Sequence, residues 1–145
     1  MKINELYRSL ILKHYKNPLN RGLLKNNLKN YFFSEEKNLS CGDEIVIQIL
    51  FNERKIIDIR YEVEGCSILI ASSSLMSVIL KNVYIENAIQ QINNFCNMLQ
   101  KKSFKKSLIC PQLKYFELIQ HFPGRVVCAS MPWTLLLKII NKNFF

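Results

Sequence analysis

The sequence predicts an α+β fold in which a small antiparallel three-stranded sheet is packed on one face by helices. Residues 57–63 alternate apolar and polar side chains, and residues 45–51 carry isoleucine or phenylalanine at every second position, which is typical of strands with one buried face. From residue 68 onward the apolar side chains recur at helical spacing instead. Because the strands come first and the helices follow, the pattern favours helices gathered on one face of an antiparallel sheet.

The elements expected before the sheet have less regular sequence patterns. Residues 4–15 predict a helix with Leu6 and Leu10 on one face, and Pro18 ends it because the residue before a proline avoids the helical region. A turn at residues 20–22 and an irregular, Asn-rich stretch from 23 to 40 follow, with a short strand at residues 31–33.

Residues 52–54 predict a hairpin turn between the two alternating strands, whose apolar faces hold Ile45, Ile47, Ile49 and Phe51, and Ile57, Ile59, Tyr61 and Val63. Helices are predicted at residues 68–81, 85–100 and 111–120. The last helix is expected to begin at Pro132, with Ser130 or Met131 near its cap.

Composition narrows the class of protein. The 145 residues fit a single domain, 1–145, that can bury its own core, and 49% hydrophobic with 21% charged residues is ordinary for a globular chain. The apolar runs are too short for a membrane span, and no apolar stretch of a signal peptide follows the N-terminus. We therefore expect neither a membrane, secreted, repeat nor fibrous protein.

The net charge of +9 gathers in the first thirty residues and in residues 101–106. Lysine, asparagine and isoleucine are all abundant, so part of this charge reflects compositional bias. Aromatic residues are not interleaved with the basic ones in the pattern of RNA-binding sheets. The sequence thus favours a solvated basic face over a nucleic-acid surface, with an acidic protein partner as the second interpretation.

The five cysteines are an odd number, and none of them forms a CxxC pair. This favours free thiols in a reducing compartment such as the cytoplasm, and it excludes a zinc ribbon and a thioredoxin motif. Cys96 falls within a helical pattern and is expected in the core. Cys110 precedes Pro111 and is given little chance of a role.

The other three cysteines lie beside turn signals. Cys41 is followed by Gly42 and Asp43, and the glycine lets the thiolate and the carboxylate point the same way. The same three residues are also compatible with a turn that has no chemical role. Cys66 stands where a strand gives way to a helix whose N-terminus favours a thiolate, with Ser67 as the predicted cap.

Cys128 is expected in a turn before the last helix, three residues after Arg125, which could pair with its thiolate. The three thiolates and the Asp43 carboxylate would complete a tetrahedral set for Zn²⁺.

Taken in order along the chain, these motifs resemble the NifU N-terminal/IscU family, and within it the SufU type. The resemblance rests on residues 6–7, 14–18, 20–22, 41–43, 64–68, 71–76, 122–125, 128–129 and 132–133. Cys66 and Cys128 are 62 positions apart, a longer gap than IscU scaffolds have, which indicates the helical insertion of SufU proteins. Val127 replaces the histidine that IscU scaffolds carry before the third cysteine, and His121 is not expected to be a ligand.

The resemblance implies an IscU/NifU N-terminal-like fold with an N-terminal helix, and Zn²⁺ bound by Cys41, Asp43, Cys66 and Cys128. It implies an accessory zinc-dependent sulfurtransferase that accepts persulfide sulfur from a SufS-type cysteine desulfurase for iron–sulfur cluster assembly, with downstream Suf scaffold proteins as further partners. Cys41 is the expected acceptor because its glycine-flanked loop moves most easily. A partner histidine would complete the metal ligands, and Arg125 would steady the freed thiolate or persulfide.

Two alternatives stay open. An IscU-like scaffold would assemble an iron–sulfur cluster on the same ligands, which the missing histidine disfavours. A basic nucleic-acid-binding module with a structural zinc ranks last, because the paired-ligand knuckles of such modules are missing from the sequence.

Overall fold

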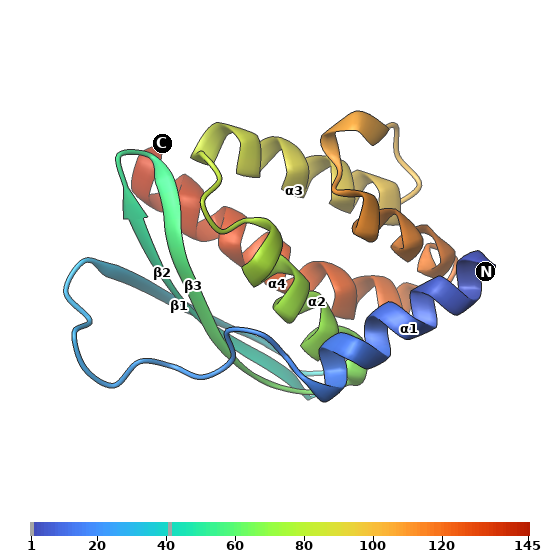
Figure 1. The fold of residues 1–145 in the computed structure, drawn as a ribbon, viewed down its shortest axis with the longest axis horizontal. Coiled ribbons are helices and arrows are strands. Elements are labelled where there is room, and N and C mark those ends of the chain that lie inside the picture. Colours follow the sequence, from blue (N-terminus) through green and yellow to red (C-terminus); the bar gives the residue numbers. More distant parts are fainter. Residues whose placement is uncertain (1, 41) are drawn as a thin grey trace.

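The computed structural model describes residues 2–40 and 42–145, and it places a three-stranded sheet against a layer of helices (Figure 1). The predicted fold class is confirmed. The strands are β1 (Tyr31–Asn38), β2 (Asp43–Asn52) and β3 (Lys55–Glu64). The helices are α1 (Ile3–Lys16), α2 (Ser67–Ile79), α3 (Ile85–Leu99) and α4 (Pro123–Phe144), with short 3₁₀ segments η1 (Lys106–Leu108) and η2 (Pro111–Ile119).

Helix α2 lies in the middle of the helical layer, where it contacts α1, α4 and β3 (Figure 1). Helix α4 also contacts β1 and β2, and α3 and η2 pack against α4 as well. The expected helices at residues 4–15, 68–81 and 85–100 match α1, α2 and α3 within two residues at each end. No helix in the described part of the chain has both the length and the apolar character that a bilayer crossing requires.

The sheet has the order β1-β2-β3, with both pairs antiparallel. Glu53 and Arg54 form the two-residue turn between β2 and β3, both at positive φ as the favoured hairpin turns require, so the expected hairpin is confirmed. Gln48, on the face of β2 opposite Ile47 and Ile49, is nevertheless buried, and its side-chain amide accepts the backbone N–H of Leu24 and donates to the Leu24 carbonyl. The segment after α1 therefore covers part of the outer face of the sheet.

One expected core residue, Ile57, is on the wrong face. A pairing irregularity at Leu50/Phe51 places Asp58 opposite Leu50 and Ile56 opposite Phe51, which leaves Ile57 without a partner. The extra residue reverses the inside–outside alternation at that end of β3. Ile56 is consequently fully buried, and Ile57 is only half-buried.

Strand β1 extends to Asn38, well beyond the expected residues 31–33. Its second half reads Ser34, Glu35, Glu36 and Lys37, which carries little of the apolar alternation that identifies strands. The strand forms because its backbone pairs with β2 from Tyr31 opposite Leu50 to Asn38 opposite Asp43. It lies at the edge of the sheet, where polar and charged side chains are typical.

The last helix begins nine residues before the expected Pro132. Helix α4 starts at Pro123, a favoured position for proline because the first N–H groups of a helix have no partner within it. Pro132 lies inside the helix, where it cannot donate to the carbonyl of Cys128 four residues earlier. Cys128 is therefore a helical residue and not part of a preceding turn.

Buried serines join α2 to its neighbours. The Ser72 hydroxyl donates to the carbonyl oxygen of Ala129 at 2.6 Å and accepts the indole N–H of Trp133 at 2.9 Å. Trp133 is fully buried and lies against Phe95, with ring centroids 5.0 Å apart. These contacts hold the first half of α4 at a fixed position on α2.

The opposite side of α2 bonds α1 through His14. Its Nδ1 lies 2.7 Å from the Ser74 hydroxyl, which also accepts the backbone N–H of Leu19 at 2.9 Å. The ring is only 4% exposed, and burial, with a smaller contribution from the charge of Lys13, lowers the pKa of His14 below its usual value of 6.5. The folded chain thus favours the neutral imidazole over the charged one.

This burial predicts a pH dependence of stability. Because the pKa is lower in the folded chain than in the unfolded one, the unfolded chain binds more protons as the pH falls below about 6.5. The free energy of unfolding should therefore decrease with falling pH from that value, by at most about 1.4 kcal/mol per pH unit. We expect His14→Gln to flatten this slope in urea unfolding between pH 7.5 and pH 5, whereas His121→Gln, at an exposed position, should keep it.

Candidate metal centre

Three metal-ligating side chains from separate elements meet at one end of the sheet. Asp43 is the first residue of β2, Cys66 is the N-cap of α2, and Cys128 lies inside α4. One ligand atom from each lies within 4.8 Å of the others. Within residues 2–40 and 42–145, this is the one group of three or more His, Cys, Asp or Glu side chains so close together. Figure 1 shows how the starts of β2 and α2 come together there.

The Asp43 carboxylate is the centre of this group. Its Oδ2 accepts a hydrogen bond from the Cys128 thiol at 3.0 Å, and its Oδ1 accepts the backbone N–H of Cys66 at 3.3 Å. Asp43 is 3% exposed and Cys128 is 8% exposed, whereas Cys66 is exposed. A buried carboxylate is therefore oriented by the other two residues, with one thiol open to an approaching partner.

The environment raises the pKa of the Cys128 thiol well above its usual value of 9.0. Burial is the main cause, and the hydrogen bond to Asp43 and the neighbouring Cys66 sulfur add to it. Without a cation the thiol keeps its proton, because a second negative charge beside the carboxylate would be unfavourable. A divalent cation removes this penalty, since metal binding displaces the proton from the thiol.

The donor set fits zinc. Two thiolates and one carboxylate are ordinary zinc ligands, and a tetrahedral site needs one more. The predicted fourth ligand, Cys41, lies outside the described residues. The structure thus brings together three of the four expected ligands, Asp43, Cys66 and Cys128.

Gly65 is a site residue that the sequence predicted only as part of the motif at residues 64–68, without a role of its own. A Cβ at this position would lie 2.8 Å from Cγ of Asp43 and 2.9 Å from Cδ2 of Leu69, and closer still to Oδ1 of Asp43. The carboxylate occupies the space that any other side chain would need. The sequence signal was a glycine directly before the candidate ligand Cys66, but only the fold shows what approaches it.

Arg125 lies one helical turn before Cys128, but it makes no hydrogen bond to a thiol among the residues that the structure describes. Its guanidinium stacks on the ring of Phe122, with 4.6 Å between its Cζ and the ring centroid. The guanidinium is exposed, so it remains available to an incoming anion.

Beside Cys66, a groove of about 660 Å³ lies between α1 and the starts of α2 and α4, and its lining includes Arg125, Tyr7 and Ser67. The Tyr7 hydroxyl is buried and has no hydrogen-bond partner in the described part of the chain. Ser67 is not the helix cap that was expected, because Cys66 occupies the N-cap position and α2 begins at Ser67 itself.

The remaining candidate residues lie elsewhere. Cys96 packs against the core, and burial raises its pKa to about 11, which leaves an unreactive thiol. Cys110 is half-buried, and its backbone N–H donates to Gln91. Neither of the two histidines belongs to the metal-ligand group: His14 bonds Ser74, and His121 is exposed near the start of α4.

The fold and the site thus define a class of protein: α+β domains with a three-stranded sheet and a cysteine–aspartate cluster of metal-ligand type. The chain belongs to the family described as the NifU-like N terminal domain, whose model matches residues 6–128.

Proteins with related sequences cover almost the whole chain. The zinc-dependent sulfurtransferase SufU of Bacillus subtilis is 33% identical over 141 residues, which is 97% of this chain and 93% of that protein. The iron–sulfur cluster assembly scaffold protein IscU of Streptococcus pyogenes serotype M1 is 28% identical, over 98% of this chain and 87% of its own length.

Solved structures agree with this assignment. A crystal structure described as a putative iron–sulfur cluster assembly scaffold protein for the SUF system, from Fervidobacterium islandicum, matches with a TM-score of 0.83 at 29% identity, over 94% of this chain and 98% of that one. The N-terminal part of a NifU-like protein from Brucella abortus, at 18% identity and a TM-score of 0.81, has the same fold over 97% of this chain and 95% of its own.

Proposed function

We propose that this chain is a zinc-dependent persulfide acceptor that takes sulfur from a cysteine desulfurase for iron–sulfur cluster assembly. The observation that carries the proposal is the convergence of Asp43, Cys66 and Cys128 in a chain 33% identical to a relative named a zinc-dependent sulfurtransferase. Residues 1–145 act as one domain in this proposal. In this proposal the protein acts in the cytoplasm, where thiols stay reduced.

Each site residue has a distinct role. Asp43, Cys66 and Cys128, together with Cys41, would hold Zn²⁺, which when bound keeps the coordinating sulfurs deprotonated at neutral pH. The buried Asp43 and Cys128 fix the position of the site, because they are held by β2 and α4. Cys66 is exposed and completes the site from the N-terminus of α2.

Cys41 is the proposed acceptor of sulfur. Its thiolate attacks the outer sulfur of the persulfide on the desulfurase, a new sulfur–sulfur bond forms at Cys41, and the donor cysteine leaves as a thiolate. The total charge and the oxidation level are unchanged, so no further oxidant or reductant is needed. Arg125 offsets the repulsion between the two anions as they approach, because its exposed guanidinium lies one turn from Cys128 on the same helix.

The donor in this proposal is a SufS-type desulfurase, and downstream Suf scaffold proteins receive the sulfur. A histidine from the desulfurase would take the ligand position that Cys41 leaves. The chain does not supply this histidine itself, since neither His14 nor His121 belongs to the ligand group.

Assembly of a cluster on this chain is the second candidate function, because relatives such as the IscU protein of Streptococcus pyogenes are named scaffolds. The same residues would then hold iron and sulfide. Val127 stands directly before Cys128 and is exposed, so no imidazole is available there as a cluster ligand. This geometry favours the sulfur acceptor.

The test is sulfur transfer from a desulfurase supplied with ³⁵S-cysteine to Cys41→Ala, with Cys110→Ala as the matched control. We expect Cys41→Ala to gain no covalent label while it retains part of its zinc, and Cys110→Ala to be labelled like the parent chain. Full labelling of Cys41→Ala would contradict the proposal. Iron and visible absorbance in the anaerobically purified protein would instead support the scaffold.

A further inference from the structure

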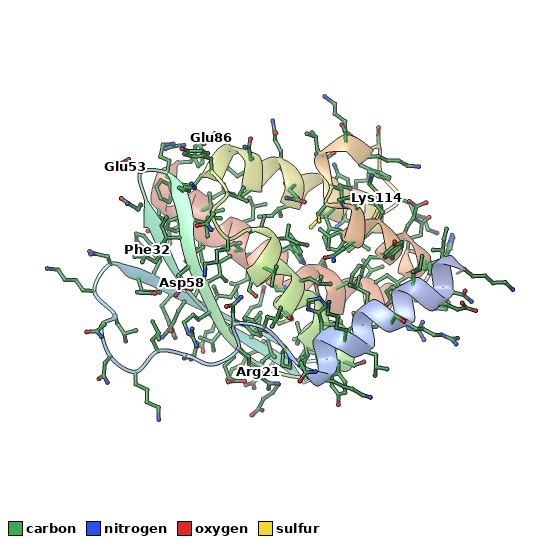
Figure 2. The ribbon with its side chains drawn as sticks, in the orientation of Figure 1. Arg21, Phe32, Glu53, Asp58, Glu86 and Lys114 are labelled. Atoms are coloured by element: carbon green, nitrogen blue, oxygen red, sulfur yellow. The ribbon has the colours of Figure 1, made fainter. Side chains whose placement is uncertain are left out.

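A basic segment that the proposed function does not use lies between α3 and α4. Residues 101–121 contain five lysines and a single glutamate. None of these lysines pairs with a carboxylate in the described chain, where the ion pairs are Arg21–Glu62, Lys37–Glu44, Arg54–Glu86 and Lys138–Glu36. Figure 2 labels Lys114 in this segment, at the end of the molecule away from the β2–β3 turn and its labelled Glu53.

This segment and the first turn of α1 enclose a groove of about 460 Å³. Its apolar lining includes Ile3 and Leu118, which are 59% and 39% exposed. Phe104 and Tyr115 line it as well, but their rings are half-buried and pack against the core. The groove therefore offers aliphatic surface to a ligand, at the boundary between two elements that the core holds in place.

The polar lining of the same groove is mainly basic. Lys106, Lys114 and His121 contribute to it, and Glu117 is the one carboxylate. Lys114 is half-buried and still has no carboxylate partner in the described chain. An unpaired ammonium at the edge of an apolar groove is favourably placed to meet an anion that arrives together with an apolar group.

We propose that this groove binds an acidic polypeptide segment, which places an aliphatic side chain against Ile3 and Leu118 and carboxylates beside Lys106 and Lys114. A nucleic acid fits less well, because it would need exposed aromatic faces for stacking and would meet the Glu117 carboxylate. The groove shares no residue with the candidate metal centre, so this proposal and the proposed function can fail separately.

The experiment uses the full zinc-loaded chain and a fluorescent synthetic peptide of alternating glutamate and leucine, followed by fluorescence anisotropy. We expect the double variant Lys106→Glu/Lys114→Glu to lower the affinity about tenfold, because two attractive charges become repulsive. The matched control is Lys25→Glu/Lys29→Glu, which changes the net charge equally at exposed positions before β1 and should change the affinity less than about twofold.

A second arm tests the apolar contact. Leu118→Ser should weaken binding of the glutamate–leucine peptide, but not of a peptide with serine in place of leucine. Thermal unfolding checks that all variants fold. Equal losses in the two double variants would overturn the proposal, as would tighter binding of a single-stranded oligonucleotide at the same groove.

Discussion

Cys66→Ser is expected to lower the zinc affinity of this chain by at least about a hundredfold, because it removes a thiolate from a four-ligand site. Cys66 is exposed, so the substitution leaves no cavity and should hardly change the stability of the zinc-free fold. The zinc affinity is measured by competition with a chromophoric chelator, and sulfur acceptance should fall together with the bound zinc.

Cys96→Ser is the matched control for this prediction, since it makes the same chemical change outside the site. Cys96 packs against the core and belongs to no ligand group, so its substitution should leave the zinc affinity unchanged and affect only stability. If Cys66→Ser bound zinc as tightly as Cys96→Ser, Cys66 would not be a ligand.

Gly65→Ala is expected to lower the zinc affinity at least about tenfold, although residue 65 is not itself a ligand. The added Cβ would lie 2.8 Å from Cγ of Asp43 and 2.9 Å from Cδ2 of Leu69, so both side chains must give way. The closest approach of the added Cβ is to Oδ1 of Asp43, so the carboxylate is the group that must move furthest. The cost to the free energy of unfolding should be about 1–3 kcal/mol, typical of overpacking.

Gly124→Ala provides the comparison. Gly124 lies in the first turn of α4, near Cys128 in sequence, and a Cβ there would meet no atom within 4 Å. Alanine is also the better helix former, so this variant should bind zinc normally and be at least as stable as the parent. Equal zinc affinities for the two alanine variants would show that the Asp43 carboxylate is not placed by the absence of a side chain at residue 65.

The secondary structure was predictable wherever packing follows the local pattern. Helices α1 to α3 and the β2–β3 hairpin follow from apolar periodicity and from turn residues. Only residues 31–33 of strand β1 were predicted, because the rest of this edge strand is held by backbone pairing that its polar side chains do not reveal. The predicted start of α4 at Pro132 was wrong. Pro123 and Pro132 are both acceptable as a first helical residue, and only packing distinguishes them.

The same division applies to the site. Apolar periodicity predicted the α+β class, and the ordered motifs around Cys41, Cys66 and Cys128 predicted the family and the residues that could bind a metal, because these depend on residue identity and spacing. Only the tertiary structure decided that Cys128 is helical, that Asp43 is buried between it and Cys66, and that Gly65 leaves room for the carboxylate. These facts depend on contacts between residues far apart in the chain, which no local pattern contains.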